Sequence, residues 1–172
     1  NGTFKVKEHF YLVRSPSENW SDYGGIIGNG ASRESNYLFE RNQKYFHSNK
    51  YPAKVWKDGD SISSSNFNLE TINAYMILRI VVNDNNLGPH SNWKIGDITG
   101  WSMDMDLAEA MCFSTSLTDE EADKVEGYLA NKWGLSGTLA NTHTYKVSSI
   151  NDPKSLFENS VDLTNLVKGN TY

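Results

Sequence analysis

The sequence predicts an all-β domain, a sandwich of two antiparallel sheets with one helix near its C-terminal end. Three observations lead to this prediction. Short apolar runs recur between polar turns from residue 4 to residue 113, residues 118–133 show a capped helical pattern, and 12% aromatic residues with 13 glycines suit short strands joined by turns. A chain of 172 residues is long enough to bury one core. We therefore expect one sandwich over residues 1–146 and a C-terminal extension over 147–172, either docked on the sandwich or linking to a partner or a next domain.

The strand candidates follow one another in chain order. Residues 4–14 carry apolar side chains at alternate positions, as a half-buried strand does. Residues 75–82 (YMILRIVV) form a nearly continuous apolar run, which is typical of a central strand covered on both faces. Asp58-Gly59 is a dipeptide that favours a two-residue hairpin turn. The other candidate strands are residues 24–28, 37–41, 53–56, 61–62, 93–95 and 101–113.

The helix is predicted from its capping signals. Thr118 is a suitable N-cap, and Glu121 follows it at the spacing of a capping box. Gly134 supplies a left-handed end. The apolar stripe expected to lie against a sheet consists of Ala122, Val125, Leu129 and Trp133. We expect the side chains of Leu129 and Trp133 to be buried between this helix and the sheet.

The end of this region carries a resemblance to a known family. Residues 126–135 read EGYLANKWGL, preceded by Ala108-Glu109 and by LTDEE at 117–121, and followed by THTY at 142–145. This ending resembles the laminin-G-like, concanavalin A-like lectin and glucanase domains of bacterial and phage proteins, which often have His-Pro-Tyr at the last position. The resemblance implies a concanavalin A-like jelly roll.

Composition excludes several functional classes. A net charge of −5, with no cluster of Lys or Arg, argues against nucleic-acid binding. No apolar run approaches the roughly 20 residues of a membrane span, so we predict no membrane insertion. Cys112 is the single cysteine and is expected to be a buried strand residue. The chain begins at Asn1 without a signal peptide, and we expect it to be a piece of a longer extracellular or virion-surface protein.

A glucanase-like arrangement of carboxylates occurs at Asp104, Asp106 and Glu109. Laminarinase-type glucanases, which share the jelly roll, carry Glu-x-Asp-x-x-Glu on one strand. Period-2 geometry puts Asp104 and Asp106 on one face, and a bulge would bring Glu109 to it. Here, however, Asp replaces the first Glu and the strand leads directly into the C-terminal helix, whereas the glucanase motif lies mid-chain. We therefore predict no catalytic residues, with a laminarinase-like endo-glycanase as an alternative.

The sequence leaves two alternatives for metal binding. Relatives of this type bind Ca²⁺ through loop oxygens, and the candidate ligands are Asp58, Asp60, Asp84 and Asp104. No single loop offers the six to eight oxygens that Ca²⁺ needs. The four histidines show no zinc spacing. The alternatives are no cofactor or a Ca²⁺ site.

A sugar-binding surface needs exposed aromatic faces beside polar side chains. The polar loops of this chain carry such aromatic residues, and loops are where binding residues concentrate. The predicted ligand-binding residues are Trp20, Tyr23, Tyr45, His47 and Tyr51. We therefore predict a non-enzymatic recognition or adhesion module that binds surface glycans. The alternative is a structural phage decoration or fibre domain that contacts neighbouring protein subunits.

Overall fold

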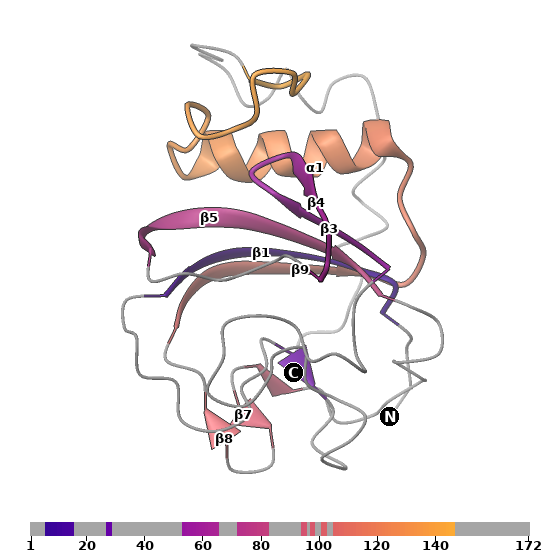
Figure 1. The fold of residues 1–172 in the computed structure, drawn as a ribbon, viewed down its shortest axis with the longest axis vertical. Helices are drawn as coiled ribbons and strands as arrows, with labels where there is room; N and C mark the ends of the chain where they lie inside the picture. The colour runs from indigo at the N-terminus through magenta and orange to yellow at the C-terminus, as the bar shows by residue number, and fades with distance from the viewer. Residues whose placement is uncertain are drawn as a thin grey trace, which may run out of the picture.

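The computed structural model describes residues 6–15, 27–28, 53–65, 72–82, 94–95, 97–98, 101–102 and 105–146. Nine strands and one helix lie in this part of the chain (Figure 1). The strands are β1 (Glu8–Ser15), β2 (Ile27–Gly28), β3 (Lys54–Lys57), β4 (Asp60–Ile62), β5 (Ile72–Val81), β6 (Lys94–Ile95), β7 (Asp97–Ile98), β8 (Trp101–Ser102) and β9 (Asp106–Phe113). The helix is α1 (Asp119–Lys132).

The main element is a five-stranded antiparallel sheet with the strand order β4-β3-β5-β1-β9. Helix α1 lies over one face of it, and the β7–β8 ribbon lies on the other side (Figure 1). A further two-stranded ribbon pairs β2 with β6. The described part of the chain is thus mostly antiparallel sheet with one helix, as the sequence predicts. In this part, no helix has the length and apolar character needed to cross a membrane.

Strand β5 lies at the centre of the sheet and is covered on both faces, as its apolar run predicts. Ile77 faces α1 and belongs to the same buried cluster as Leu129. Its neighbours Met76 and Leu78 point to the opposite face, because successive strand residues alternate, and they are at most 2% exposed. The sheet therefore has apolar cores on both sides.

The hairpin between β3 and β4 turns at Asp58-Gly59, as predicted. Both residues have positive φ, 52° and 85°, and Lys57 pairs with Asp60 across the turn. This is the backbone that a two-residue hairpin of primed type requires.

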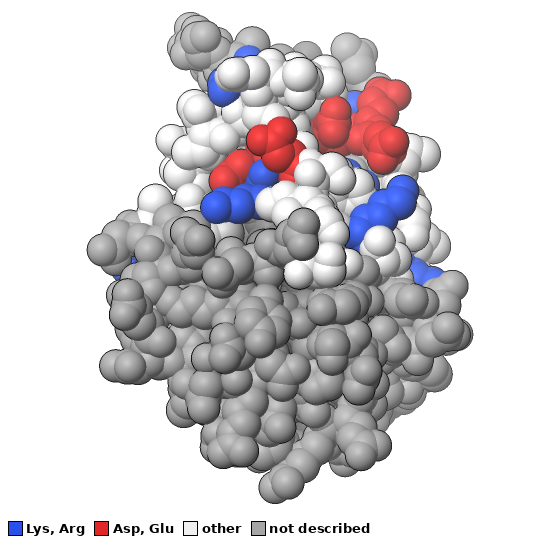
Figure 2. Space-filling view, viewed as in Figure 1, with Lys and Arg blue, Asp and Glu red and all other residues white. Residues whose placement is uncertain are grey.

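Helix α1 begins and ends as its sequence predicts. Thr118 is the N-cap, and both hydrogen bonds of the capping box with Glu121 are present. Gly134 follows the helix with a φ of 71°. Figure 2 shows acidic side chains gathered over the end of the molecule where α1 begins, and the first turn holds three of them. They are stabilised there by the helix dipole.

The buried stripe of α1 differs from the predicted one. The buried positions are Ala122, Glu126, Gly127, Leu129 and Ala130. Leu129 is buried as expected, but Trp133 is 44% exposed, so its predicted burial is wrong. Trp133 lies at the helix end, where its indole bonds to β9, the edge strand of the main sheet, and no strand among the described residues lies beyond β9. Cys112 is exposed on the same edge strand, and its predicted burial is also wrong.

A buried ion pair connects the sheet to the helix. Nε of Arg79 on β5 donates to Oε1 of Glu8 on β1 at 2.5 Å, and the two side chains are 4% and 0% exposed. The second oxygen of Glu8 accepts the backbone N–H of Leu117 at 2.8 Å. The guanidinium of Arg79 also stacks on Trp56 of β3, 3.8 Å from the ring centroid. This group therefore fixes three strands and the entry to α1 together.

Substituting Glu8 by Ala should lower the free energy of unfolding by about 3–5 kcal/mol, because the buried charge of Arg79 loses its buried partner and keeps only the exposed Asp119 at 3.9 Å. Urea denaturation of the purified chain measures this. The control is Glu120→Ala, which breaks the exposed Glu120–Lys124 pair and should cost less than about 1 kcal/mol. Equal losses in the two variants would contradict this role of Glu8.

Candidate functional site

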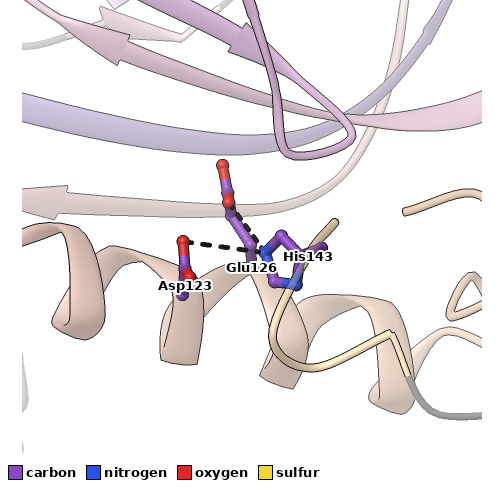
Figure 3. A group of neighbouring side chains, drawn as sticks. All are labelled: Asp123, Glu126 and His143. Atoms are coloured by element: carbon purple, nitrogen blue, oxygen red, sulfur yellow. Dashed lines mark hydrogen bonds and ion pairs between the residues drawn. The ribbon is translucent and has the colours of Figure 1, made fainter. Parts of the chain in front are cut away.

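Asp123, Glu126 and His143 form a cluster of three side chains that metals commonly bind, which we call the Asp-Glu-His cluster (Figure 3). Their ligand atoms lie within 4.8 Å of one another. Nε2 of His143 is 3.1 Å from Oε2 of Glu126 and 3.9 Å from Oδ1 of Asp123. The Glu126 and His143 side chains are 1% and 2% exposed, whereas that of Asp123 is 31% exposed. The cluster is therefore buried but reaches solvent at Asp123.

Two segments of the chain build this cluster. Asp123 and Glu126 are three residues apart on α1, so their side chains are neighbours on its surface, and Figure 3 shows both beside His143. His143 comes from the loop after the helix. This loop is tied to the hairpin by the Ala140 N–H, which donates to the Asp58 carbonyl at 2.8 Å.

The hydrogen bonds of His143 define its tautomer. Nδ1 accepts the backbone N–H of Tyr145 at 3.2 Å, so this nitrogen carries a lone pair. The ring proton of the neutral imidazole then lies on Nε2 and is donated to Glu126. As found, the His143–Glu126 contact fastens the loop to the helix.

One atom of the cluster lacks a partner. Oε1 of Glu126 is buried and has no hydrogen bond within the described part of the chain. Leaving a buried acceptor of this kind unpaired costs free energy, more so for a charged group. Asp58 lies close enough to respond to this charge. Burial is the main cause that raises the pKa of Asp58, the hydrogen bond from the Ile77 N–H opposes it, and the charge of Glu126 adds to the rise.

The hairpin turn packs directly on the imidazole. A Cβ on Gly59 would lie 2.5 Å from Cδ2 of His143, so no other residue fits at this position without displacing the ring. Similarly, a Cβ on Gly127 would lie 2.5 Å from Cβ of Tyr145. These two glycines allow the hairpin and the loop to close over the cluster.

Most of the predicted site residues lie outside the described residues. These are the ligand-binding candidates Trp20, Tyr23, Tyr45, His47 and Tyr51, the metal candidates Asp84 and Asp104, and the extension 147–172. The other two metal candidates lie in the hairpin. Asp58 uses Oδ1 to accept the Ile77 N–H at 2.8 Å, and Asp60 is exposed. The structure therefore places one predicted ligand, Asp58, beside the Asp-Glu-His cluster.

The other two glucanase-like carboxylates are described, and both are paired. The register of β1 and β9 shifts between Leu12 and Val13, so this bulge puts Asp106 and Glu109 on the same face of the sheet. Oδ2 of Asp106 accepts from Nε of Arg14 at 2.8 Å. Glu109 accepts from Nζ of Lys132 at 3.0 Å.

Glu109 also holds an exposed tryptophan in place. Nε1 of Trp133 donates to Oε2 of Glu109 at 2.7 Å, and Nζ of Lys132 lies 5.8 Å from the Trp133 ring centroid. The hydrogen bond to Glu109, followed by one to Tyr128, raises the pKa of Lys132. We call Glu109, Lys132 and Trp133 the edge platform. Trp133 is the one large hydrophobic side chain that is exposed among the described residues.

A third group lies on the face of the sheet opposite α1. Tyr11 Oη is 2.7 Å and Cys112 Sγ is 3.6 Å from Nδ1 of His9. Burial lowers the pKa of His9 to about 3 and raises that of Cys112 to about 11, although the cysteine is exposed as a whole residue. A reactive cysteine needs a lowered pKa. His9 is therefore a neutral imidazole and Cys112 a protonated thiol. We assign both residues a structural role.

Sequence reasoning did not select Asp123, Glu126 or His143 as a site. Glu126 and His143 come from segments separated by a turn, so their spacing matches no metal-binding motif. A signal was nonetheless present, since both residues belong to the segments 126–135 and 142–145 that carry the family resemblance. Comparisons of the chain with protein-family models, with curated proteins and with solved structures each gave no match.

Substituting Gly59 by Ala should destabilise the protein by about 1–3 kcal/mol, because the new methyl group overlaps His143 and φ is +85°. Thermal unfolding measures the loss. The matched control is Gly137→Ala, where no atom lies within 4 Å and φ is not positive, and which should be neutral or slightly stabilising. Similar losses in both variants would contradict the close packing of the hairpin on the imidazole.

Stability should fall as the pH drops below about 6.5. The folded-state pKa of His9 is about 3, below the ordinary 6.5, so only the unfolded chain takes up a proton between these values. The contribution of His9 is complete above pH 6.5 and decreases towards pH 3. His9→Gln can still accept from Tyr11 but does not titrate, so it should flatten the stability profile between pH 6.5 and 5. An unchanged slope in chemical denaturation would contradict a buried neutral His9.

Proposed function

We propose that this chain is a non-enzymatic recognition module that binds glycans as part of a larger extracellular or virion-surface protein. The edge platform is the observation that carries the proposal. An indole at 44% exposure offers an apolar face to solvent, while its N–H is fixed on Glu109. The C–H face of a pyranose packs well on such a ring, because aromatic faces are apolar and carry partial negative charge.

Polar groups beside the indole suit the hydroxyls of a sugar. Lys132, whose side chain is 44% exposed, supplies ammonium donors next to the ring. The hydrogen bond already holds the indole in one orientation. Binding a sugar would therefore cost little additional side-chain entropy. The proposal adds Trp133 to the ligand-binding residues predicted from the sequence, which include Trp20 and Tyr45.

For the whole chain we propose the concanavalin A-like jelly roll that the family resemblance implies. Two observations support it. The face of the main sheet opposite α1 is buried, with Tyr11, Val13, Val55 and Ile80 at 0% exposure, as it would be against a second sheet. The β7–β8 ribbon also lies on this side (Figure 1).

The pairing of the described carboxylates supports a binding role over hydrolysis. Retaining and inverting glycosidases need two carboxyl groups free to act on the sugar. Asp106 is held by Arg14, and Glu109 is shared between Lys132 and Trp133. Turnover of a β-glucan that is lost in Glu109→Gln would contradict the non-enzymatic proposal.

Substituting Trp133 by Ala should weaken glycan binding at least about tenfold, because a stacking anchor typically contributes 2 kcal/mol or more. The melting temperature should change little, since the indole is partly exposed. Binding is measured on a glycan array and with soluble laminarin, xylan and alginate. Lys124→Ala is the control on the same helix, away from the platform, and should bind like the parent chain.

Two further outcomes are informative. Loss of binding in Trp20→Ala but not in Trp133→Ala would move the site to the predicted loops. No binding to any glycan would contradict the proposal and favour the structural module that contacts neighbouring subunits.

A further inference from the structure

We propose that Asp123, Glu126 and His143 form a binding site for one divalent transition metal ion of the zinc class. The inference goes beyond glycan recognition and uses different residues. It rests on the spacing of the three ligand atoms, on the unpaired oxygen of Glu126, and on the charge of the cluster.

Two of the three spacings between the ligand atoms lie near those of a tetrahedral site, and all three are within 4.8 Å. Zinc bound at 2.0–2.2 Å by nitrogen and oxygen places neighbouring ligands about 3.4 Å apart. The two distances from Nε2 of His143 are 3.1 Å to Glu126 and 3.9 Å to Asp123, on either side of this value. Asp123 is the most exposed of the three, so it is also the one that can adjust. Solvent reaching Asp123 provides an entry path and a fourth ligand.

The unpaired oxygen is an independent indication of a ligand. Glu126 is 1% exposed, and its Oε1 has no partner among the described residues, although the other oxygen lies in the cluster. Buried polar atoms are paired in the great majority of cases, and an exception calls for an explanation. A cation that Glu126 binds through both of its oxygens would supply the missing partner.

Charge and ligand type together select the kind of ion. Two carboxylates and a neutral imidazole leave the cluster with an excess of negative charge, and the nearest loop brings in a further carboxylate at Asp58. One nitrogen and two carboxylates suit Zn²⁺, Co²⁺ or Ni²⁺, whereas Ca²⁺ prefers six or more oxygens. The site is thus distinct from the Ca²⁺ site considered from the sequence.

Metal binding would leave a recognisable mark on His143. In the structure the ring proton lies on Nε2, the nitrogen that would bind the metal. A metal ion on Nε2 would displace this proton, and the ring would carry a proton on Nδ1 instead. The Tyr145 N–H then gives up its 3.2 Å hydrogen bond to that nitrogen. The change of tautomer is visible in the imidazole nitrogen signals by NMR, and it involves no net loss of a proton from the ring.

The test uses the full chain, freed of metal with a chelator and titrated with ZnCl₂ by calorimetry and thermal unfolding. We expect Zn²⁺ to raise the melting temperature, as any ligand of the native state does, and CaCl₂ to have no such effect. Glu126→Gln and Asp123→Asn should each weaken Zn²⁺ binding at least about tenfold. Glu126→Gln can still accept the Nε2 proton, and Asp123 is partly exposed, so both variants are expected to fold.

Glu120→Gln is the matched control. It removes the same charge from the same helix, at an exposed position outside the cluster, and should bind Zn²⁺ like the parent chain. The proposal is overturned by the absence of heat and of a thermal shift at millimolar Zn²⁺, by an equal response to Ca²⁺, or by equal weakening in Glu120→Gln and Glu126→Gln. Retained Zn²⁺ binding in Trp133→Ala would separate this site from the glycan surface.

Discussion

The buried ion pair between Glu8 and Arg79 is the interaction on which the arrangement of sheet and helix depends. Its charges lie between the sheet and α1, and they are compensated from several elements at once: Glu8 accepts from Leu117, and Arg79 stacks on Trp56. A buried pair is not an efficient source of stability, because desolvation offsets most of the attraction. Here the ion pair fixes the position of α1 relative to the sheet. By accepting the Leu117 N–H, Glu8 holds the segment that enters α1 at one place over the sheet.

The two ends of α1 are held by different means, and the Asp-Glu-His cluster depends on both. At the N-terminal end, Glu8 and the capping box fix where the helix begins. Beyond its C-terminal end, the loop returns to the hairpin through Asp58 and then fastens to the helix through His143. Gly59 is needed at the contact, since any side chain would enter the imidazole. The cluster is thus a junction of helix, hairpin and loop, which explains why Glu126 and His143 are buried although both are polar.

The position of β9 at the edge of the sheet accounts for the exposed features. Trp133 and Cys112 are exposed because no described strand lies beyond β9. The same edge carries Asp106 and Glu109 in ion pairs with Arg14 and Lys132. Charged side chains on an edge strand oppose uncontrolled pairing with another chain. Among the described residues, the edge therefore presents a polar surface with one exposed large hydrophobic side chain, Trp133.

Local rules made much of the fold predictable from the sequence. The capping box at Thr118, the left-handed residue at Gly134 and the turn at Asp58-Gly59 depend on backbone geometry within a few residues, and all three are found as predicted. The continuous apolar run over 75–82 correctly indicated a central strand, because only a strand covered on both faces tolerates such a run. These features need no knowledge of distant contacts.

Tertiary structure alone decided the order of the strands, the buried face of the helix and the candidate metal site. The apolar stripe of the helix predicted Trp133 as a core residue. A helical pattern, however, contains no information on where the sheet beneath the helix ends. From the sequence, Glu126 is expected on the surface of the helix. The contacts of His143 with Glu126 and with Gly59 show that the helix, the loop and the hairpin meet over it. Pairing β1 with β9, about 100 residues away along the chain, is likewise set by which apolar faces bury each other. Sequence patterns state which side chains need burial or a charge partner, and only the packed chain determines which partner each one meets.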